Sequence, residues 1–89
     1  MMAAATKTEI SEWFDRGIET GMAYMLVVCD RFDHEDYPVY AENDEQAFKA
    51  NREHNGPNMQ KVMEVYDLRL DKQTQLNEFR AFHLPAIKY

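Results

Sequence analysis

Four acidic side chains lie within seven residues of one another and form the group best suited to chemistry in this chain. They are Asp30, Asp33, Glu35 and Asp36. Carboxylate oxygens are the ligands that Ca²⁺ and Mg²⁺ prefer, and the neighbouring His34 adds a nitrogen suited to a transition metal. The spacing does not match a calcium-binding EF-hand loop, because a pattern that starts at Asp33 puts Pro38 where a glycine is required. The segment favours a solvated loop, and the alternative is a divalent-metal-dependent hydrolase or a metal-regulated protein that uses these carboxylates.

Aromatic side chains alternate with the carboxylates, a pattern typical of a protein-binding surface. An aromatic anchor supplies contact area in such a surface, while the surrounding charge orients the partner and speeds association. Phe32 lies between Arg31 and Asp33 in a polar loop and has no evident place in a core. The candidate interaction residues are Phe32, Asp33, His34, Glu35, Asp36, Tyr37 and Tyr40. The alternative is that Tyr37 and Tyr40 are ordinary strand residues that pack on a hairpin.

No residue pattern in the chain predicts a catalytic side chain. Cys29 ends an apolar run beside carboxylates, and negative neighbours raise the pKa of a thiol, so we expect a buried cysteine and not a nucleophile paired with His34. The three histidines, which include His54 and His83, lack metal-ligand spacing. The single serine and the three glycines form no nucleophile elbow, phosphate-binding loop or dinucleotide fingerprint. These observations favour a protein that is not an enzyme and that needs no cofactor.

All of the net charge comes from one acidic stretch. Residues 30–45 hold seven carboxylates and one arginine, whereas the rest of the chain holds nine acidic and nine basic side chains. The net charge of −6 argues against binding to nucleic acid or to a membrane surface, because both need clustered lysine or arginine. A single cysteine allows no intramolecular disulfide, and the first residues lack a signal-peptide pattern, so we expect a cytoplasmic protein.

Two segments in the first two thirds of the chain have the pattern of helices. Thr6 begins a capping-box sequence, and apolar residues follow it at helical spacing over residues 8–20. The side chains expected to face inward there are Ile10, Trp13, Phe14 and Ile18. Residues 44–54 follow a cap at Asn43 or Asp44, with Ala47 and Ala50 inward and Phe48 as the one large anchor.

Three segments have the pattern of strands. Residues 24–29 are apolar at every position, which suits a strand that is covered on both faces. Residues 37–41 form a short strand, and its Pro38 places it at a sheet edge or begins it after the proline. Residues 59–68 form the third strand, in which we expect Val62 to share one face with Tyr66 and Leu68 while Met63 and Val65 share the other.

Asp71 is a cap for a third helix over residues 72–83, which Leu84 and Pro85 end. The side chains expected to face inward are Leu76, Phe79 and either Phe82 or His83. The order is therefore helix, strand, strand, helix, strand, helix, which is an α+β fold. The first two strands form an antiparallel hairpin, and the second helix lets the third strand run parallel to the second on the far side of the first. This predicts a three-stranded sheet of order 2-1-3 packed by helices.

The chain of 89 residues has room for one small domain, residues 1–89, with residues 1–6 and 86–89 frayed. The segments 28–40 and 59–68 resemble a small family of bacterial and phage proteins, and the resemblance covers the chain from Trp13 to about His83. It carries over no catalytic or binding residue. It implies a cytoplasmic accessory protein that acts by binding something else. We therefore expect an interaction domain that contacts a protein partner, or a second copy of itself, through residues 30–40.

Overall fold

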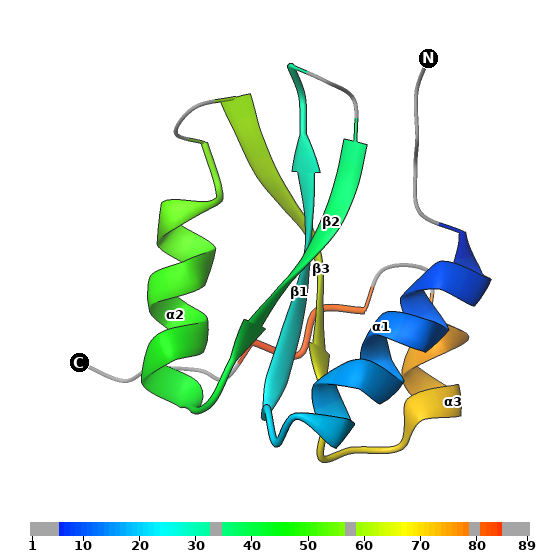
Figure 1. The fold of residues 1–89 in the computed structure, drawn as a ribbon. Helices are drawn as coiled ribbons and strands as arrows, with labels where there is room; N and C mark the ends of the chain where they lie inside the picture. The colour runs from blue at the N-terminus through cyan, green and yellow to red at the C-terminus, as the bar shows by residue number, and fades with distance from the viewer. Residues whose placement is uncertain (1–5, 33–34, 57–58, 79–80, 85–89) are drawn as a thin grey trace.

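The computed structural model describes residues 6–32, 35–56, 59–78 and 81–84, and it has the expected order of elements (Figure 1). The helices and strands are α1 (Lys7–Glu19), β1 (Tyr24–Asp30), β2 (Glu35–Ala41), α2 (Asp44–Glu53), β3 (Gln60–Asp67) and α3 (Lys72–Leu76). The predicted α+β fold is confirmed. None of the described helices combines the length and the apolar character needed to cross a bilayer.

The sheet has the order β2-β1-β3, as predicted. Strand β1 pairs antiparallel with both neighbours, so β2 and β3 run in the same direction on either side of it. Five consecutive residues of β1, Tyr24 to Val28, are buried, because this strand has neighbours on both edges and helices on both faces. Pro38 lies in the edge strand β2, where a residue without an N–H is tolerated.

Two apolar clusters form the core, one on each face of the sheet. Helix α2 covers one face and places Ala47 and Ala50 against Leu26 and Val28 of β1. Helices α1 and α3 cover the other face (Figure 1). There Phe14 packs edge-on to Tyr66 with ring centroids 6.1 Å apart. The capping box at Thr6 is confirmed, since its hydroxyl accepts a hydrogen bond from the Glu9 N–H and its own N–H donates to the Glu9 carboxylate.

One inward position in α1 was predicted wrongly, because a glycine takes the place of a large side chain. Gly17 faces the sheet, and a Cβ atom there would lie 2.6 Å from Leu68 Cδ1 and 2.8 Å from Tyr40 Cε1. The helix therefore approaches the sheet closely along its Gly17 side. Ile18 is left at the margin of the contact and is 50% exposed. Helix α2 also packs on the sheet through small residues. Its Ala47 and Ala50 are buried, whereas Phe48, the predicted anchor, is only partly buried and lies outside the cluster under α2.

The expected faces of β3 were also wrong, because a bulge interrupts the alternation. Val27 pairs with Glu64 and Val28 pairs with Val62, so Met63 is an extra residue in the ladder. The bulge puts Val62 and Val65 in the cluster under α2, while Tyr66 and Leu68 lie in the cluster under α1.

Helix α3 is much shorter than the predicted helix, and residues 81–84 beyond it pair with a strand. Residues 81–84 run along the outer edge of β3, where Val65 N donates to Ala81 O at 2.9 Å and His83 N donates to Val65 O at 2.9 Å. Pairing with the edge of β3 replaces the helical hydrogen bonds that the sequence pattern favoured. Phe82 is accordingly 53% exposed and His83 is partly buried, whereas Phe79 lies outside the described residues.

Candidate functional site

The turn between β1 and β2 presents an aromatic side chain to solvent. Asp30 and Glu35 are the last residues that pair across the hairpin, and Phe32 N donates a hydrogen bond to Asp30 Oδ1 at 2.9 Å. This local bond turns the backbone and satisfies the Phe32 N–H. The Phe32 side chain is 72% exposed, the highest value among the exposed large hydrophobic side chains in the described part of the chain. Asp33 and His34 lie outside the described residues.

A second exposed apolar residue, Met59, lies beside this turn and was not predicted as part of a site. Arg31 N donates to Met59 O at 2.8 Å, which joins the turn to the residue that precedes β3. Met59 is 54% exposed and has a φ of 61°, in the left-handed region that non-glycine residues rarely adopt. The sequence separation of Arg31 and Met59 hid this contact, because only the β1–β3 pairing brings the two segments together. We call Asp30, Arg31, Phe32, Glu35 and Met59 the hairpin tip.

Tyr37 and Tyr40, the two tyrosines of β2 that were predicted as interaction residues, lie on different faces of the sheet. Tyr37 packs against the cluster under α2 and lies edge-on to His54 with ring centroids 6.4 Å apart. Tyr40 packs on the opposite face, where its hydroxyl donates to Trp13 O at 2.7 Å. Burial raises the pKa of both hydroxyls. The structure therefore does not bring Tyr37 and Tyr40 together, and both contribute to packing.

The carboxylates of the loop are also divided between the two faces. Asp36 pairs with Cys29, whereas Glu35 pairs with Asp30, and successive residues of a strand point to opposite faces. Burial and the adjacent Asp36 carboxylate raise the pKa of the Cys29 thiol, as the sequence predicted, although Cys29 is only partly buried. Within residues 6–32, 35–56, 59–78 and 81–84, no three His, Cys, Asp or Glu side chains are grouped closely enough to hold a metal ion. No pocket is found in the described part of the fold.

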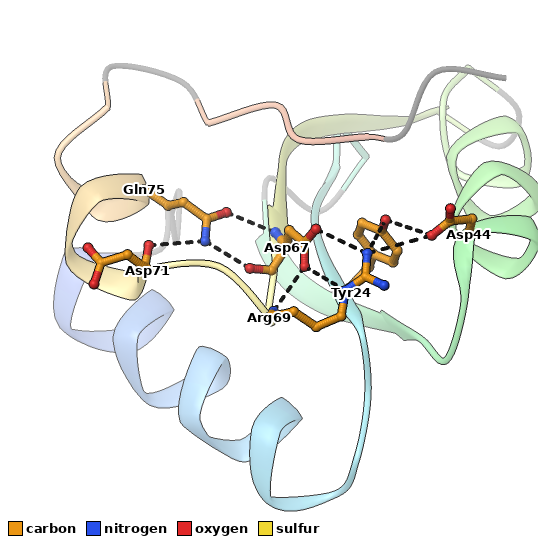
Figure 2. Close-up of polar contacts among 6 residues, drawn as sticks. All are labelled: Tyr24, Asp44, Asp67, Arg69, Asp71 and Gln75. Carbon is orange, nitrogen blue, oxygen red and sulfur yellow. Dashed lines mark hydrogen bonds and ion pairs between the residues drawn. The ribbon is translucent and has the colours of Figure 1, made fainter.

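A second polar group, at the opposite end of the sheet, also escaped the sequence analysis. Figure 2 shows the residues that it joins, which come from β1, α2, β3, α3 and the turn between β3 and α3: Tyr24, Asp44, Asp67, Arg69, Asp71 and Gln75. The Arg69 guanidinium donates to both Asp67 oxygens at 3.0 and 3.1 Å and to the Tyr24 hydroxyl at 2.6 Å. It also lies over the Tyr24 ring, 4.9 Å from its centroid. We call Tyr24, Asp44, Asp67, Arg69 and Gln75 the Arg69 cluster.

The polar atoms of the Arg69 cluster are satisfied by one another. The Tyr24 hydroxyl donates to Asp44 Oδ1 at 2.7 Å, and burial, followed by this hydrogen bond, raises its pKa to about 12. The Gln75 side chain accepts from Asp67 N and donates to Asp67 O, both at 2.8 Å, so it fastens α3 to the end of β3. A tyrosine hydroxyl with this pKa is not a base near neutral pH. The arrangement therefore stabilises the fold and offers no reactive group.

Comparison with models of protein families, with curated proteins and with solved structures gives no match for this chain.

Proposed function

We propose that the protein is an interaction module that contacts a protein partner through the hairpin tip. The observation that carries this proposal is the exposure of two apolar side chains, Phe32 and Met59, on backbone segments joined by the Arg31 to Met59 hydrogen bond. Burying a side chain of this size stabilises a complex by about 1.5–3 kcal/mol, and aromatic residues are over-represented among the residues that dominate binding energy.

The construction of the tip supports a binding role over a role in packing. Asp30 uses its side chain to hold the turn in place, and residues Asp30 and Gln60 are still paired in the ladder at this end of the sheet. A side chain presented on an ordered turn loses less conformational entropy on binding than one on a free chain. Isolated exposed hydrophobic residues are common on protein surfaces, and what distinguishes these two is the backbone hydrogen bond from Arg31 to Met59 that joins their segments.

The experiment is a comparison of partner capture by the full chain and by two variants. Phe32→Ser removes the anchor from the hairpin tip, and Leu70→Ser removes another large exposed apolar side chain (53%) from the turn that follows β3. Each chain is immobilised and incubated with a cell lysate, and the proteins captured from the lysate are quantified by mass spectrometry. We expect Phe32→Ser to lose the proteins captured by the unmodified chain and Leu70→Ser to retain them.

A triple variant, Asp33→Asn, Glu35→Gln and Asp36→Asn, tests the loop charges separately from the aromatic ring. We expect it to weaken capture while the melting temperature stays within a few degrees of the unmodified chain. Light scattering of the unmodified chain, together with Phe32→Ser, measures self-association in the same samples. The proposal is wrong if capture and molar mass are the same for the unmodified chain, Phe32→Ser and the triple variant.

A further inference from the structure

We infer that Asn55 is a site of spontaneous modification, at which the side-chain amide is converted to a carboxylate, and that the folded turn between α2 and β3 slows this conversion. The reaction consumes only water, and the inference does not depend on the proposed function. Three features carry it: the residue that follows Asn55, the exposure of the turn, and two hydrogen bonds that hold the reacting groups.

The first feature is the sequence Asn55-Gly56. An asparagine is modified when the backbone nitrogen of the next residue gives up its proton and attacks the side-chain carbonyl carbon. A bond forms between Gly56 N and Asn55 Cγ, the Cγ–Nδ2 bond breaks, and ammonia leaves, so that a cyclic succinimide remains. Glycine has no side chain to hinder this attack, and its backbone adopts angles that other residues rarely reach. Of the five asparagines in the chain, Asn55 alone is followed by glycine.

Water completes the reaction by adding to one of the two carbonyl groups of the succinimide. If the bond from Gly56 N to Cγ breaks, residue 55 becomes an ordinary aspartate. If the bond from Gly56 N to the backbone carbonyl carbon breaks, residue 55 becomes isoaspartate, in which the main chain runs through Cβ and Cγ and gains a methylene group. Both products carry one more negative charge than the unmodified chain.

The second feature is the place of this pair in the fold. Asn55 and Gly56 follow the C-cap of α2, His54, and both are exposed to solvent. Gly56 has a φ of 120°, and a Cβ atom there would meet no other atom within 4 Å. Glycine is therefore required at this position by the backbone angle and not by lack of space. The open space beside Gly56 gives the reacting groups access to water.

The third feature is a pair of hydrogen bonds that restrain the reacting groups. Gly56 N donates to Gln60 O at 2.7 Å, so the nitrogen gives up its proton only after this bond opens. Asn55 Oδ1 accepts from Val62 N at 3.3 Å, which directs the side-chain carbonyl at β3. The His54 ring, with Nδ1 2.8 Å from Gln60 Oε1, joins the end of α2 to the start of β3. Conversion of Asn55 therefore requires a local opening of the turn.

The two products differ in their effect on β3. The carboxylate of an aspartate at residue 55 can still accept from Val62 N, whereas the longer main chain of isoaspartate displaces both this carboxylate and the nitrogen of Gly56. Val62 is 5% exposed, so water does not readily replace the acceptor that its N–H loses. We therefore expect the fold to tolerate aspartate and to lose the connection between α2 and β3 when isoaspartate forms.

The test follows the full chain by peptide mapping and mass spectrometry during incubation at mildly alkaline pH, with a parallel sample unfolded in guanidinium chloride. In both samples we expect Asn55 to be converted before any other asparagine. The folded chain should react about tenfold more slowly, because the hydrogen bonds of the turn must open first. Equal rates in the two samples would overturn the restraint by the fold. Faster conversion at another asparagine would overturn the assignment of the site; the others are Asn43, Asn51, Asn58 and Asn77.

A variant tests whether the turn restrains the reaction. Gln60→Ala removes the side chain that contacts His54 and leaves Asn55 and Gly56 unchanged. We expect it to speed conversion about threefold in the folded chain, since one hydrogen bond is lost, and to have no effect in the unfolded chain. Gln73→Ala, at an exposed position of α3, is the matched control and should change neither rate. A Gln60→Ala rate equal to that of the unmodified or the control chain would contradict the restraint.

The products are separated by anion exchange, and hydrogen exchange of the Val62 amide is compared in NMR spectra. The isoaspartate chain should lose the protection of this amide that the unmodified chain shows. Asn55→Asp, which reproduces the other product, should retain it. Equal protection in the isoaspartate chain and in Asn55→Asp would overturn the effect assigned to the longer main chain.

Discussion

The two ends of the sheet differ in the contacts that their side chains make. In the Arg69 cluster, side chains from β1, α2, β3 and the turn after β3 bond to one another, and Gln75 of α3 bonds to the backbone of Asp67, so this end joins distant elements (Figure 2). At the hairpin tip, the hydrogen bond that the Asp30 side chain accepts from Phe32 N shapes the turn, and two apolar side chains, Phe32 and Met59, are exposed to solvent. The comparison indicates that the end with the Arg69 cluster, which we call the base, stabilises the fold, whereas the hairpin tip leaves apolar side chains exposed for binding. Substitutions at the base should change stability, and substitutions at the tip should change binding.

The largest effect on stability is expected for Gln75→Ala. Gln75 is 1% exposed, and its removal leaves the Asp67 N–H without its partner, while the Asp67 C=O loses one donor and keeps Leu70 N at 3.1 Å. Leaving a buried backbone N–H unsatisfied costs about 2–3 kcal/mol. Urea denaturation measures the change, and Gln73→Ala, an exposed position on the same short helix, is the matched control. Equal effects of the two substitutions would show that Gln75 does not fasten α3 to β3.

Gly17→Ala should destabilise the protein by about 1–2 kcal/mol through overpacking. The added methyl group would lie 2.6 Å from Leu68 Cδ1 and would press on the Tyr40 ring, whose hydroxyl is held by Trp13 O. Leu68→Ala in the Gly17→Ala background opens space for the methyl group, so the loss should be smaller than the sum of the two single effects. Simple additivity in urea denaturation of the four chains would contradict the close approach of α1 to the sheet.

Tyr24→Phe should destabilise the protein by about 1 kcal/mol, because it removes one hydroxyl that bonds to Asp44 and Arg69. The substitution should also change the response to high pH. The pKa of Tyr24 rises from 10.0 to about 12 on folding, so its contribution is fully present below pH 10 and is lost as pH rises toward 12.

The measurement is the free energy of unfolding at several pH values between neutrality and this alkaline range. Tyr24→Phe should decline less steeply above pH 10 than the unmodified chain. An unchanged slope would mean that Tyr24 ionises in the folded protein as it does in the unfolded one. Other tyrosines with raised pKa, such as the buried Tyr66, contribute equally to both curves.

The smallest effect, and the only stabilising one, is expected at the tip. Met59→Gly relieves the strain at φ 61° and should raise the free energy of unfolding by about 0.5–1 kcal/mol. Met59→Ala removes the same side chain and keeps the strain, so it should be neutral within about 0.5 kcal/mol. Both variants should capture less of the proteins that the unmodified chain captures. A destabilised Met59→Gly would show that the side chain contributes to the fold, which would weaken the contrast between tip and base.

Much of the fold was predictable because local patterns and connectivity agreed. The uniformly apolar segment 24–29 identified the central strand, Pro38 identified an edge strand, and the caps at Thr6, Asn43 and Asp71 are all confirmed. The errors arose where tertiary contacts overrode the local pattern. The bulge at Met63 changed the faces of β3, and pairing of residues 81–84 with β3 replaced the end of a helix.

The candidate site was predictable only in part. Sequence singled out Phe32 because an aromatic residue in a polar loop has no local packing partner, and the structure leaves it 72% exposed. Met59 and the Arg69 cluster carry no such local signal. Arg31 and Met59, or Tyr24 and Arg69, are neighbours only because β3 lies beside β1.

The sequence by itself determined the class of the fold, the order of the strands and the concentration of negative charge in residues 30–45, because these follow from composition, periodicity and loop length. The tertiary structure alone decided which side chains meet at each end of the sheet. Strand register and a single bulge set these contacts, and a shift of one residue moves a side chain to the opposite face. For that reason the acidic loop was visible in the sequence, whereas its apolar neighbour Met59 and the polar base opposite it were not.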